Sequence, residues 1–196
     1  VMSLMLINHH YYRDAKINRA IFPTSCDQLA AQLQSLNDYG WKIGNACTDL
    51  SLFVDGTSRL QQKIAIITFD DGLAEQVDAL DVFAKFQALP IFFIPTQPIT
   101  SGIVLDVHKI QLIRDEITEQ EFANELSKNF GFDKFVFDDQ ALEMQYRYDN
   151  ELNRRIKYYL NFCISKNLKK DWLNEYFLRL FGCEKAFSKA FYMKKE

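Results

Sequence analysis

Apolar residues in the first half of the chain fall into short continuous runs separated by stretches with helical spacing. Three runs, Met2–Asn8, Lys63–Phe69 and Ile91–Ile94, have the length of strands, and the second is rich in β-branched residues. A weaker fourth run lies near Ile103–Leu105. Continuous apolar runs are typical of strands buried on both faces, so the pattern predicts a parallel sheet with helical crossovers.

The first crossover helix is expected after Ser25. Gln28 follows three residues later, which is the spacing of a capping box, and Gly40 suits the C-terminal end of the helix. The leucines that share its expected apolar face are Leu29, Leu33 and Leu36.

The second crossover helix is expected within Leu73–Leu89, where Pro90 would stop it. Its expected apolar face contains Val77, Leu80 and Ala84. Together the two helices and three strands predict an α/β fold.

The second half of the chain changes character, because helical spacing dominates it. Thr118 and Glu121 have the spacing of another capping box, and two wide apolar stripes follow within residues 152–164 and 172–181. We therefore expect residues 1–115 to form an α/β portion. Residues 116–196 are expected to form a helical insert or cover packed on it, within a single domain.

Composition narrows the classes of function. The chain has 196 residues, of which 48% are hydrophobic and 25% charged, the balance of a globular protein that buries a sizeable core. Its formal net charge is -3, whereas nucleic-acid-binding domains are usually basic, so no nucleic-acid partner is expected. The longest early apolar run is too short for a membrane span and has no cleavage pattern, so no membrane span and a cytoplasmic location are expected.

The cysteines point away from a disulfide framework or a zinc ribbon. The four are far apart and form no CxxC pair, so we expect buried, reduced thiols. They are Cys26, Cys47, Cys163 and Cys183.

The strongest chemical signal is an acidic pair at the end of the second expected strand. Asp70 and Asp71 follow the apolar run directly, and Gly72 allows a tight turn into the next helix. Catalytic groups of parallel α/β folds gather at the carboxyl ends of strands. One carboxylate could hold a metal while the other takes a proton from water, or one could simply cap the helix.

Residues Thr68–Gly72 (TFDDG) resemble the first motif of the polysaccharide deacetylase family, also called the NodB homology family of carbohydrate esterases. Two further segments are similar to the family in the same order. His9–Asp14 looks like its opening segment, and Leu89–Ile94 looks like the strand after the first crossover helix. The resemblance covers about residues 2–98.

The second half also resembles one branch of that family, which carries a helical insert after this strand. The similar segments are Tyr146–Asp149 and the helix around Ile156–Asn161.

This resemblance implies a partial or distorted (β/α) barrel of the NodB type with a helix-rich second half. It also implies hydrolysis of the acetamide of an N-acetylated sugar or polysaccharide precursor, so the expected substrate is a carbohydrate. By position, Asp70 would be the catalytic base and Asp71 a metal ligand, with His10 near the same strand-end face. The expected cofactor is a divalent metal, zinc, which would polarise the acetyl carbonyl and activate a water.

The chain departs from the family because it lacks the two histidines, four residues apart, that supply the other metal ligands. The only later histidine is His108, and Leu112 stands four residues after it. Two explanations stay open. The pair could lie beyond residue 196 in a longer enzyme, or the site could be rebuilt from Asp71, His10 and His108. A closed barrel needs eight strands and about 250 residues, which favours the longer enzyme.

Two alternatives to an active enzyme also stay open. One is a catalytically incomplete NodB-like fragment. The other is an α/β binding module, whose open sheet edge and aromatic helices would bind a partner chain or a second copy in a homo-oligomer. No substrate-binding residue is predicted from the sequence.

Overall fold

The computed structural model describes residues 3–13, 21–54 and 62–194, which form two compact units. The first unit holds the described residues up to 103 together with 185–194, and the second holds residues 104–184 with Ile21. The boundaries of the compact units follow Ile103 and Glu184. The domain boundary expected between residues 115 and 116 stays a prediction.

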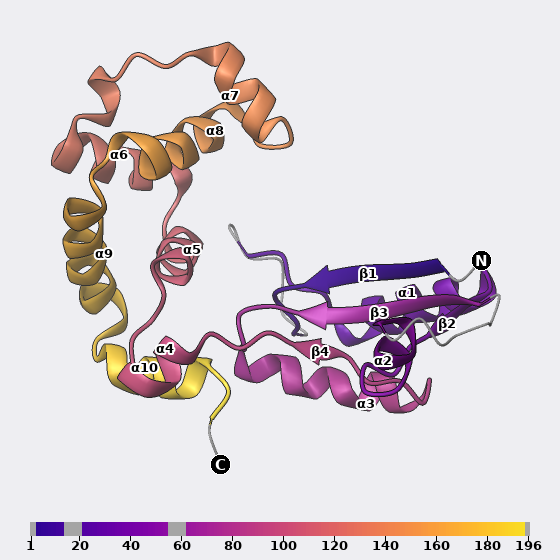
Figure 1. Cartoon of the computed structure of the whole chain (residues 1–196). Coiled ribbons are helices and arrows are strands. Elements are labelled where there is room, and N and C mark those ends of the chain that lie inside the picture. The colour runs from indigo at the N-terminus through magenta and orange to yellow at the C-terminus, as the bar shows by residue number, and fades with distance from the viewer. Residues whose placement is uncertain (1–2, 14–20, 55–61, 195–196) are drawn as a thin grey trace. The chain divides into compact units, whose positions relative to one another are not determined.

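The first unit is built on a parallel sheet of four strands (Figure 1). The third strand is central, because the first strand pairs with it along its whole length and the other two pair with its opposite ends. The strands are β1 (Ser3–His9), β2 (Trp41–Ile43), β3 (Lys63–Phe69) and β4 (Ile91–Phe92). The parallel α/β class predicted from the sequence is therefore confirmed, while the described strands form an open sheet and do not close a barrel.

Within the described residues, six helices accompany this sheet, and they connect its strands or follow them. They are α1 (Cys26–Asp38), α2 (Asp49–Val54), the 3-10 helix η1 (Ala74–Ala79), α3 (Leu80–Ala84), α4 (Thr96–Ser101) and α10 (Glu184–Phe191).

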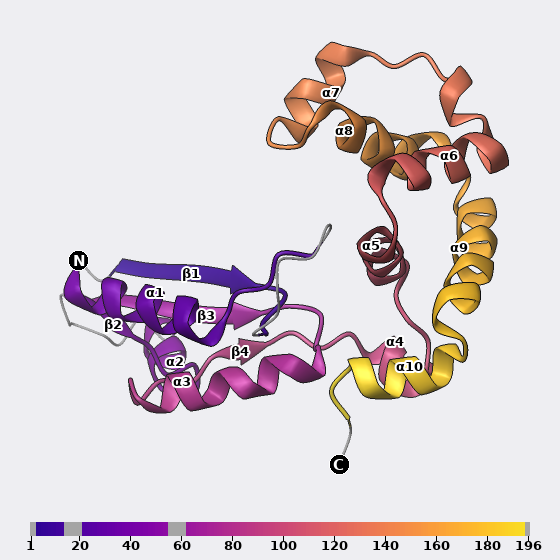
Figure 2. The ribbon, with the colours of Figure 1, turned by 180° about the vertical axis from the view of Figure 1, so that it is seen from behind.

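Helix α1 confirms the first crossover prediction. The Ser25 hydroxyl accepts the Gln28 N–H and the Gln28 side chain accepts the Ser25 N–H, so the capping box is complete. Leu29 and Leu33 are fully buried in one cluster with the apolar side chains on one face of β3. The helix crosses the face of the sheet that is turned toward the viewer in Figure 2. The sheet residues of this cluster are Ala65, Ile67 and Phe69.

The apolar face predicted for the second crossover helix is wrong. Val77 and Ala84 are exposed, because the segment begins as the 3-10 helix η1 and turns α-helical only at Leu80. A 3-10 turn holds three residues rather than 3.6, so it rotates the buried face relative to an α-helix. The buried residues of η1 and α3 are Gln76, Ala79, Val82 and Phe83.

Strand predictions had mixed outcomes. The run Lys63–Phe69 is β3 itself, and the first and third runs overlap β1 and β4. Residues Ile103–Leu105 are not a strand; they lead into a helix, for which Leu105 is the N-cap. Strand β2 was not predicted, since three residues are too few to show a pattern.

The second unit is entirely helical among the described residues. Its aromatic core includes Phe122, Trp172 and Phe177, and the Trp172 ring meets Phe122 edge-on at 5.7 Å. Thr118 completes the predicted capping box, and Gly131 ends that helix. The elements are α5 (Asp106–Glu116), α6 (Glu119–Phe130), η2 (Phe132–Lys134), α7 (Asp139–Tyr146), α8 (Glu151–Tyr158), the π-helical turn η3 (Tyr159–Cys163) and α9 (Lys166–Phe181).

The cysteine prediction was half right. All four thiols are free, but Cys47 and Cys183 are exposed and the other two are only half-buried, Cys26 at the edge of the core. Among the described helices, none has the length and apolar character that a membrane span requires.

Candidate active site at the ends of β1 and β3

The register of two parallel strands brings their polar ends together. Asn8 pairs with Thr68 and His9 pairs with Phe69 at the last two positions of the ladder. The Asp70 N–H then continues the pairing by donating to the His9 carbonyl at 3.0 Å. The two segments that leave the sheet, from His10 and from Asp70, therefore start side by side.

Asp70 is oriented by a side-chain amide from the neighbouring strand. The Asn8 Nδ2 group donates to Asp70 Oδ2 at 2.8 Å. Asn8 is held in turn, because its Oδ1 accepts the hydroxyl of buried Thr68 at 3.0 Å. A neutral amide orients the Asp70 carboxylate but does not neutralise its negative charge, so the charge can act on a ligand.

Asp71 points to a different partner. The distance between Asp71 Oδ2 and His10 Nδ1 is 3.0 Å, with the Asp71 side chain 24% and the His10 side chain 53% exposed. Asp71 has φ of 78°, in the left-handed region that non-glycine residues rarely adopt and that aspartate tolerates better than most. Such strained positions cluster at functional sites. The two adjacent carboxylates thus meet different groups, and their separate roles stay a prediction.

Gly72 makes this turn sterically feasible. Its φ is +60°, and a Cβ added to it would lie 2.8 Å from Ile94 Cγ2 and 3.2 Å from Ile94 Cα. Both the backbone conformation and the space therefore require glycine after Asp71.

Gln76 joins the two backbone segments that leave β1 and β3 around the acidic pair. Its fully buried side chain donates to the His10 and Asp70 carbonyls and accepts the Leu73 N–H at 3.1 Å. The His10 carbonyl follows β1, whereas the other two groups belong to the loop after β3, so one amide sets the spacing of the two segments. Gln76 is a positioning residue that sequence reasoning missed.

His9 and His10 face different surroundings, as expected for neighbours in an extended segment. His9 contacts Thr24 Oγ1 at 3.2 Å and Gln32 Oε1 at 3.0 Å, and its ring lies against Phe69. Burial lowers the pKa of His9, while the Gln32 contact opposes this and the His10 charge adds to it. His9 therefore packs, and His10 is the histidine of the site.

A second group of polar side chains lies beside Asp71. Burial raises the pKa of the Tyr11 phenol, and the charges of Asp71, Tyr192 and Glu75 raise it further. Burial also raises the pKa of Glu75, against the opposing effect of Arg13, whose Nε lies 3.8 Å from the Glu75 carboxylate. Tyr11 therefore keeps its proton throughout the neutral range beside an aspartate.

The predicted metal ligands are brought together only in part. Asp71 and His10 meet, but His108 belongs to the second unit, where it is fully buried in α5. Within the described residues, no three or more histidine, cysteine, aspartate or glutamate side chains are arranged to hold a metal ion. Structural and catalytic zinc sites have at least three protein ligands, so the described donors do not fit a complete site. The role of His108 as a ligand stays a prediction.

Two of the residues that build the site were missed for different reasons. Asn8 carries a weak signal, because it is a polar residue at the end of an apolar strand that pairs in register with Thr68. Gln76 carries none, because its role depends on the 3-10 turn that changes which residues face inward.

Comparison with solved structures found partial matches to several deacetylases. No protein-family model and no curated protein matches the sequence. A de-N-acetylase from Aggregatibacter actinomycetemcomitans is 22% identical with a TM-score of 0.38, and the match covers 45% of this chain and 36% of that chain. The deacetylase PplD from Streptococcus pyogenes, in complex with acetate, is 16% identical with a TM-score of 0.41, covering 58% and 51%.

BC0361, a polysaccharide deacetylase from Bacillus cereus, is 16% identical with a TM-score of 0.40, covering 74% of this chain and 55% of that chain. The chain thus spans between about a third and a little over half of the solved chains that these three matches involve. By their names these three matched proteins are deacetylases.

Proposed function

We propose that the ends of β1 and β3 are the acid–base centre of an amide hydrolase that removes the acetyl group from an N-acetylated sugar or polysaccharide precursor. The observation that carries the proposal is that the two adjacent carboxylates after β3 have different hydrogen-bond partners. Asp70 is held by Asn8 at 2.8 Å, whereas Asp71 meets His10 at 3.0 Å. Two carboxylates with separate partners can take separate roles in one reaction.

In this proposal Asp70 accepts a proton from the attacking water. Its Oδ2 is occupied by the Asn8 amide, so the other oxygen is the one that receives the proton. Loss of the amine then requires a proton donor, and in this proposal the Tyr11 phenol, which stays protonated and feels the charge of Asp71, supplies it. Water attacks the acetyl carbon, the carbon–nitrogen bond breaks, and acetate and the free amino sugar leave.

A divalent metal ion, zinc by the resemblance, belongs to the proposal as a cofactor that would polarise the acetyl carbonyl. Asp71 and His10 offer two donors, and further donors would have to come from outside the group that the described residues form. Elemental analysis of the zinc-loaded chain and of Asp71→Ala tests this directly. One zinc per chain that is lost in the variant supports the pair as ligands, and equal zinc content in both overturns it.

The fold in this proposal is a distorted (β/α) barrel to which the four described strands belong. The exposed face of β1 supports the idea, because Leu6 is 61% exposed in the middle of a strand. Additional strands of a barrel would cover such a residue.

The decisive experiment is acetate release from N-acetylglucosamine oligosaccharides by the purified chain and by Asp70→Asn. We expect the variant to lose activity by about 10²–10⁴-fold, the usual effect of removing a general base. Its thermal midpoint should stay unchanged, because asparagine has the same shape and Asp70 is only half-buried. Asp78→Asn is the matched control, since Asp78 is exposed in the same unit. Full activity in Asp70→Asn would contradict the proposal.

A second candidate function is a catalytically incomplete relative that binds carbohydrate without hydrolysing it. The observation that favours it is the lack of a three-ligand metal group among the described residues. Carbohydrate binding with no acetate release, with or without added zinc, would support this candidate over the first.

A further inference from the structure

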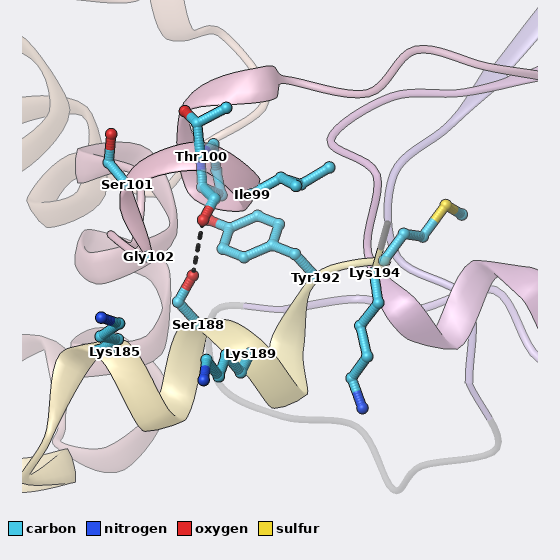
Figure 3. A pocket seen from close by; sticks show the side chains of 11 residues that line it. Ile99, Thr100, Ser101, Gly102, Lys185, Ser188, Lys189, Tyr192 and Lys194 are labelled. Carbon is cyan, nitrogen blue, oxygen red and sulfur yellow. Dashed lines mark hydrogen bonds between the residues drawn. The ribbon is translucent and has the colours of Figure 1, made fainter. Parts of the chain in front are cut away.

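A pocket of about 460 Å³ lies in the first unit, between helix α4 and helix α10 (Figure 3). Its volume is within the range of about 300–1,000 Å³ that small-molecule sites occupy. One wall is Pro98–Gly102, and the other runs from Lys185 along α10 to Lys194. No sequence motif indicated this pocket, since its two walls are more than 80 residues apart in the chain.

The pocket is held by specific packing between the two helices. The buried Ser188 hydroxyl donates to the Ile103 carbonyl at 3.0 Å and contacts the Pro98 carbonyl at 3.4 Å. Gly102 ends α4 with φ of +65°, and a Cβ there would lie 3.0 Å from Lys185 Cγ. The stem of Lys185 therefore crosses the glycine, which fixes the base of this side chain at the rim.

The charge of the pocket is strongly one-sided. Lys185, Lys189 and Lys194 line it, and none of the described lining residues is acidic. None of the three lysines forms an ion pair with another described residue. Lys185 and Lys189 are four residues apart on α10, so they share one helix face and repel each other. A bound anion would relieve this repulsion and accept their hydrogen bonds.

The pocket is joined to the loop that carries the acidic pair. The Met193 N–H, from the pocket wall, donates to the Gly72 carbonyl at 2.9 Å, and Tyr192 forms a bridge with Leu73. These bonds begin one residue after Asp71. The same molecule could therefore contact the pocket and the ends of β1 and β3.

We propose that this lysine pocket binds an anionic group, a phosphate or a carboxylate, carried by the carbohydrate substrate. The inference rests on the proposed function for the identity of the substrate, whereas anion binding itself does not depend on catalysis. Lys185 and Lys189 supply the charge on one helix face, and Lys194 supplies a third ammonium from the adjoining segment. The pocket should therefore favour an acidic acetylated sugar over a neutral one.

Direct binding tests the pocket. Inorganic phosphate and glucuronate are titrated calorimetrically into the full chain and into the double variant Lys185→Gln/Lys189→Gln. Each lost charge-assisted hydrogen bond is worth about tenfold in affinity, so we expect the double variant to bind at least about tenfold more weakly. Phosphate binding alone would assign a phosphorylated sugar, and glucuronate binding alone would assign a uronic acid.

The matched control is Lys166→Gln/Lys170→Gln, which removes the same charge from two exposed lysines with the same spacing on α9. This control should bind both probes as the unaltered chain does. The proposal is overturned if neither probe binds the unaltered chain, or if the control loses as much affinity as the pocket variant.

Acetate release separates this inference from the proposed function. With N-acetylglucosamine 1-phosphate, the pocket variant should have a KM raised about tenfold, while release from neutral N-acetylglucosamine is unchanged. Asp70→Asn should abolish release from both sugars and leave phosphate binding intact. Phosphate binding without any acetate release would support the anion pocket and contradict the proposed hydrolase. Acetate release with equal KM values for the two sugars would support the hydrolase and contradict the anion pocket.

Discussion

Two polar groups, Lys109 in the helical unit and Asp70 in the α/β unit, are held in different ways. In the helical unit, Lys109 is 3% exposed and its Nζ lies 2.6 Å from the Glu184 carboxylate. At the end of the sheet in the other unit, Asp70 is held by the neutral amide of Asn8, and Gln76 holds only backbone groups. Charges that are neutralised inside the protein serve its folding. A carboxylate that is oriented by an amide keeps its charge for a substrate.

The largest effect should come from breaking the buried ion pair of the helical unit. In Glu184→Gln the Lys109 ammonium stays buried without its counter-charge, which should cost about 3 kcal/mol or more. Urea unfolding followed by the fluorescence of Trp172, in the same unit, measures the change. Glu151→Gln is the control, because its pair with Arg155 is exposed and should be worth less than about 0.5 kcal/mol. Equal effects in the two variants would contradict this account of the helical unit.

The next largest loss of stability should come from replacing Gln76, the buried neutral side chain of the α/β unit. Gln76→Ala leaves the His10 and Asp70 carbonyls and the Leu73 N–H without their partner, which should cost about 2–3 kcal/mol. Catalysis should fall as well, because the ends of β1 and β3 lose their common support. Urea unfolding and acetate release are measured together. Gln34→Ala, an exposed change on α1, should alter stability by less than about 0.5 kcal/mol. A stable and fully active Gln76→Ala would show that the backbone alone sets the site.

A pair of glycine substitutions separates backbone strain from steric overlap in the two units. Gly131→Ala, in the helical unit, meets no atom within 4 Å and should cost about 1 kcal/mol for its left-handed backbone. Gly72→Ala adds the overlap with Ile94, so it should cost about 2 kcal/mol and also displace Asp71. Thermal unfolding gives both values. Equal losses of stability would mean that Ile94 moves freely, and unchanged activity in Gly72→Ala would mean that the turn does not position Asp71.

Local signals predicted the local parts of this molecule. The capping box at Ser25 and the β-branched run at Lys63–Phe69 each act within a few residues, and both produced the expected element. The TFDDG string at the end of that run located the acidic pair for the same reason. His10 was left open between packing and function, and the register of β1 on β3 settles that it meets Asp71.

Long-range parts of the molecule were not predictable from the pattern. The buried face of residues 73–89 depends on a 3-10 turn that Gln76 stabilises by bonding to three backbone groups. The lysine pocket forms between α4 and α10, which are separated in the sequence by the helical unit. No residue spacing in the sequence indicates that these two helices meet. Neutral amides such as those of Asn8 and Gln76 also resemble ordinary surface residues in a sequence, so their roles emerge only from tertiary contacts.

The smallest effect we predict is a pH dependence of stability at His9, which separates the packing histidine from the site histidine. Burial lowers the pKa of His9 in the folded state below its ordinary value of 6.5. The unfolded chain therefore binds the proton more readily, so the stability contributed by neutral His9 is present above pH 6.5 and is lost as the pH falls toward the folded pKa. In His9→Gln, the fall of the unfolding free energy between pH 6.5 and 5 should become shallower, as urea unfolding at several pH values would show. His10→Gln is the companion variant, since its ring is exposed and pairs with Asp71. If His10→Gln flattened the profile and His9→Gln did not, the division of roles between the two histidines would be wrong.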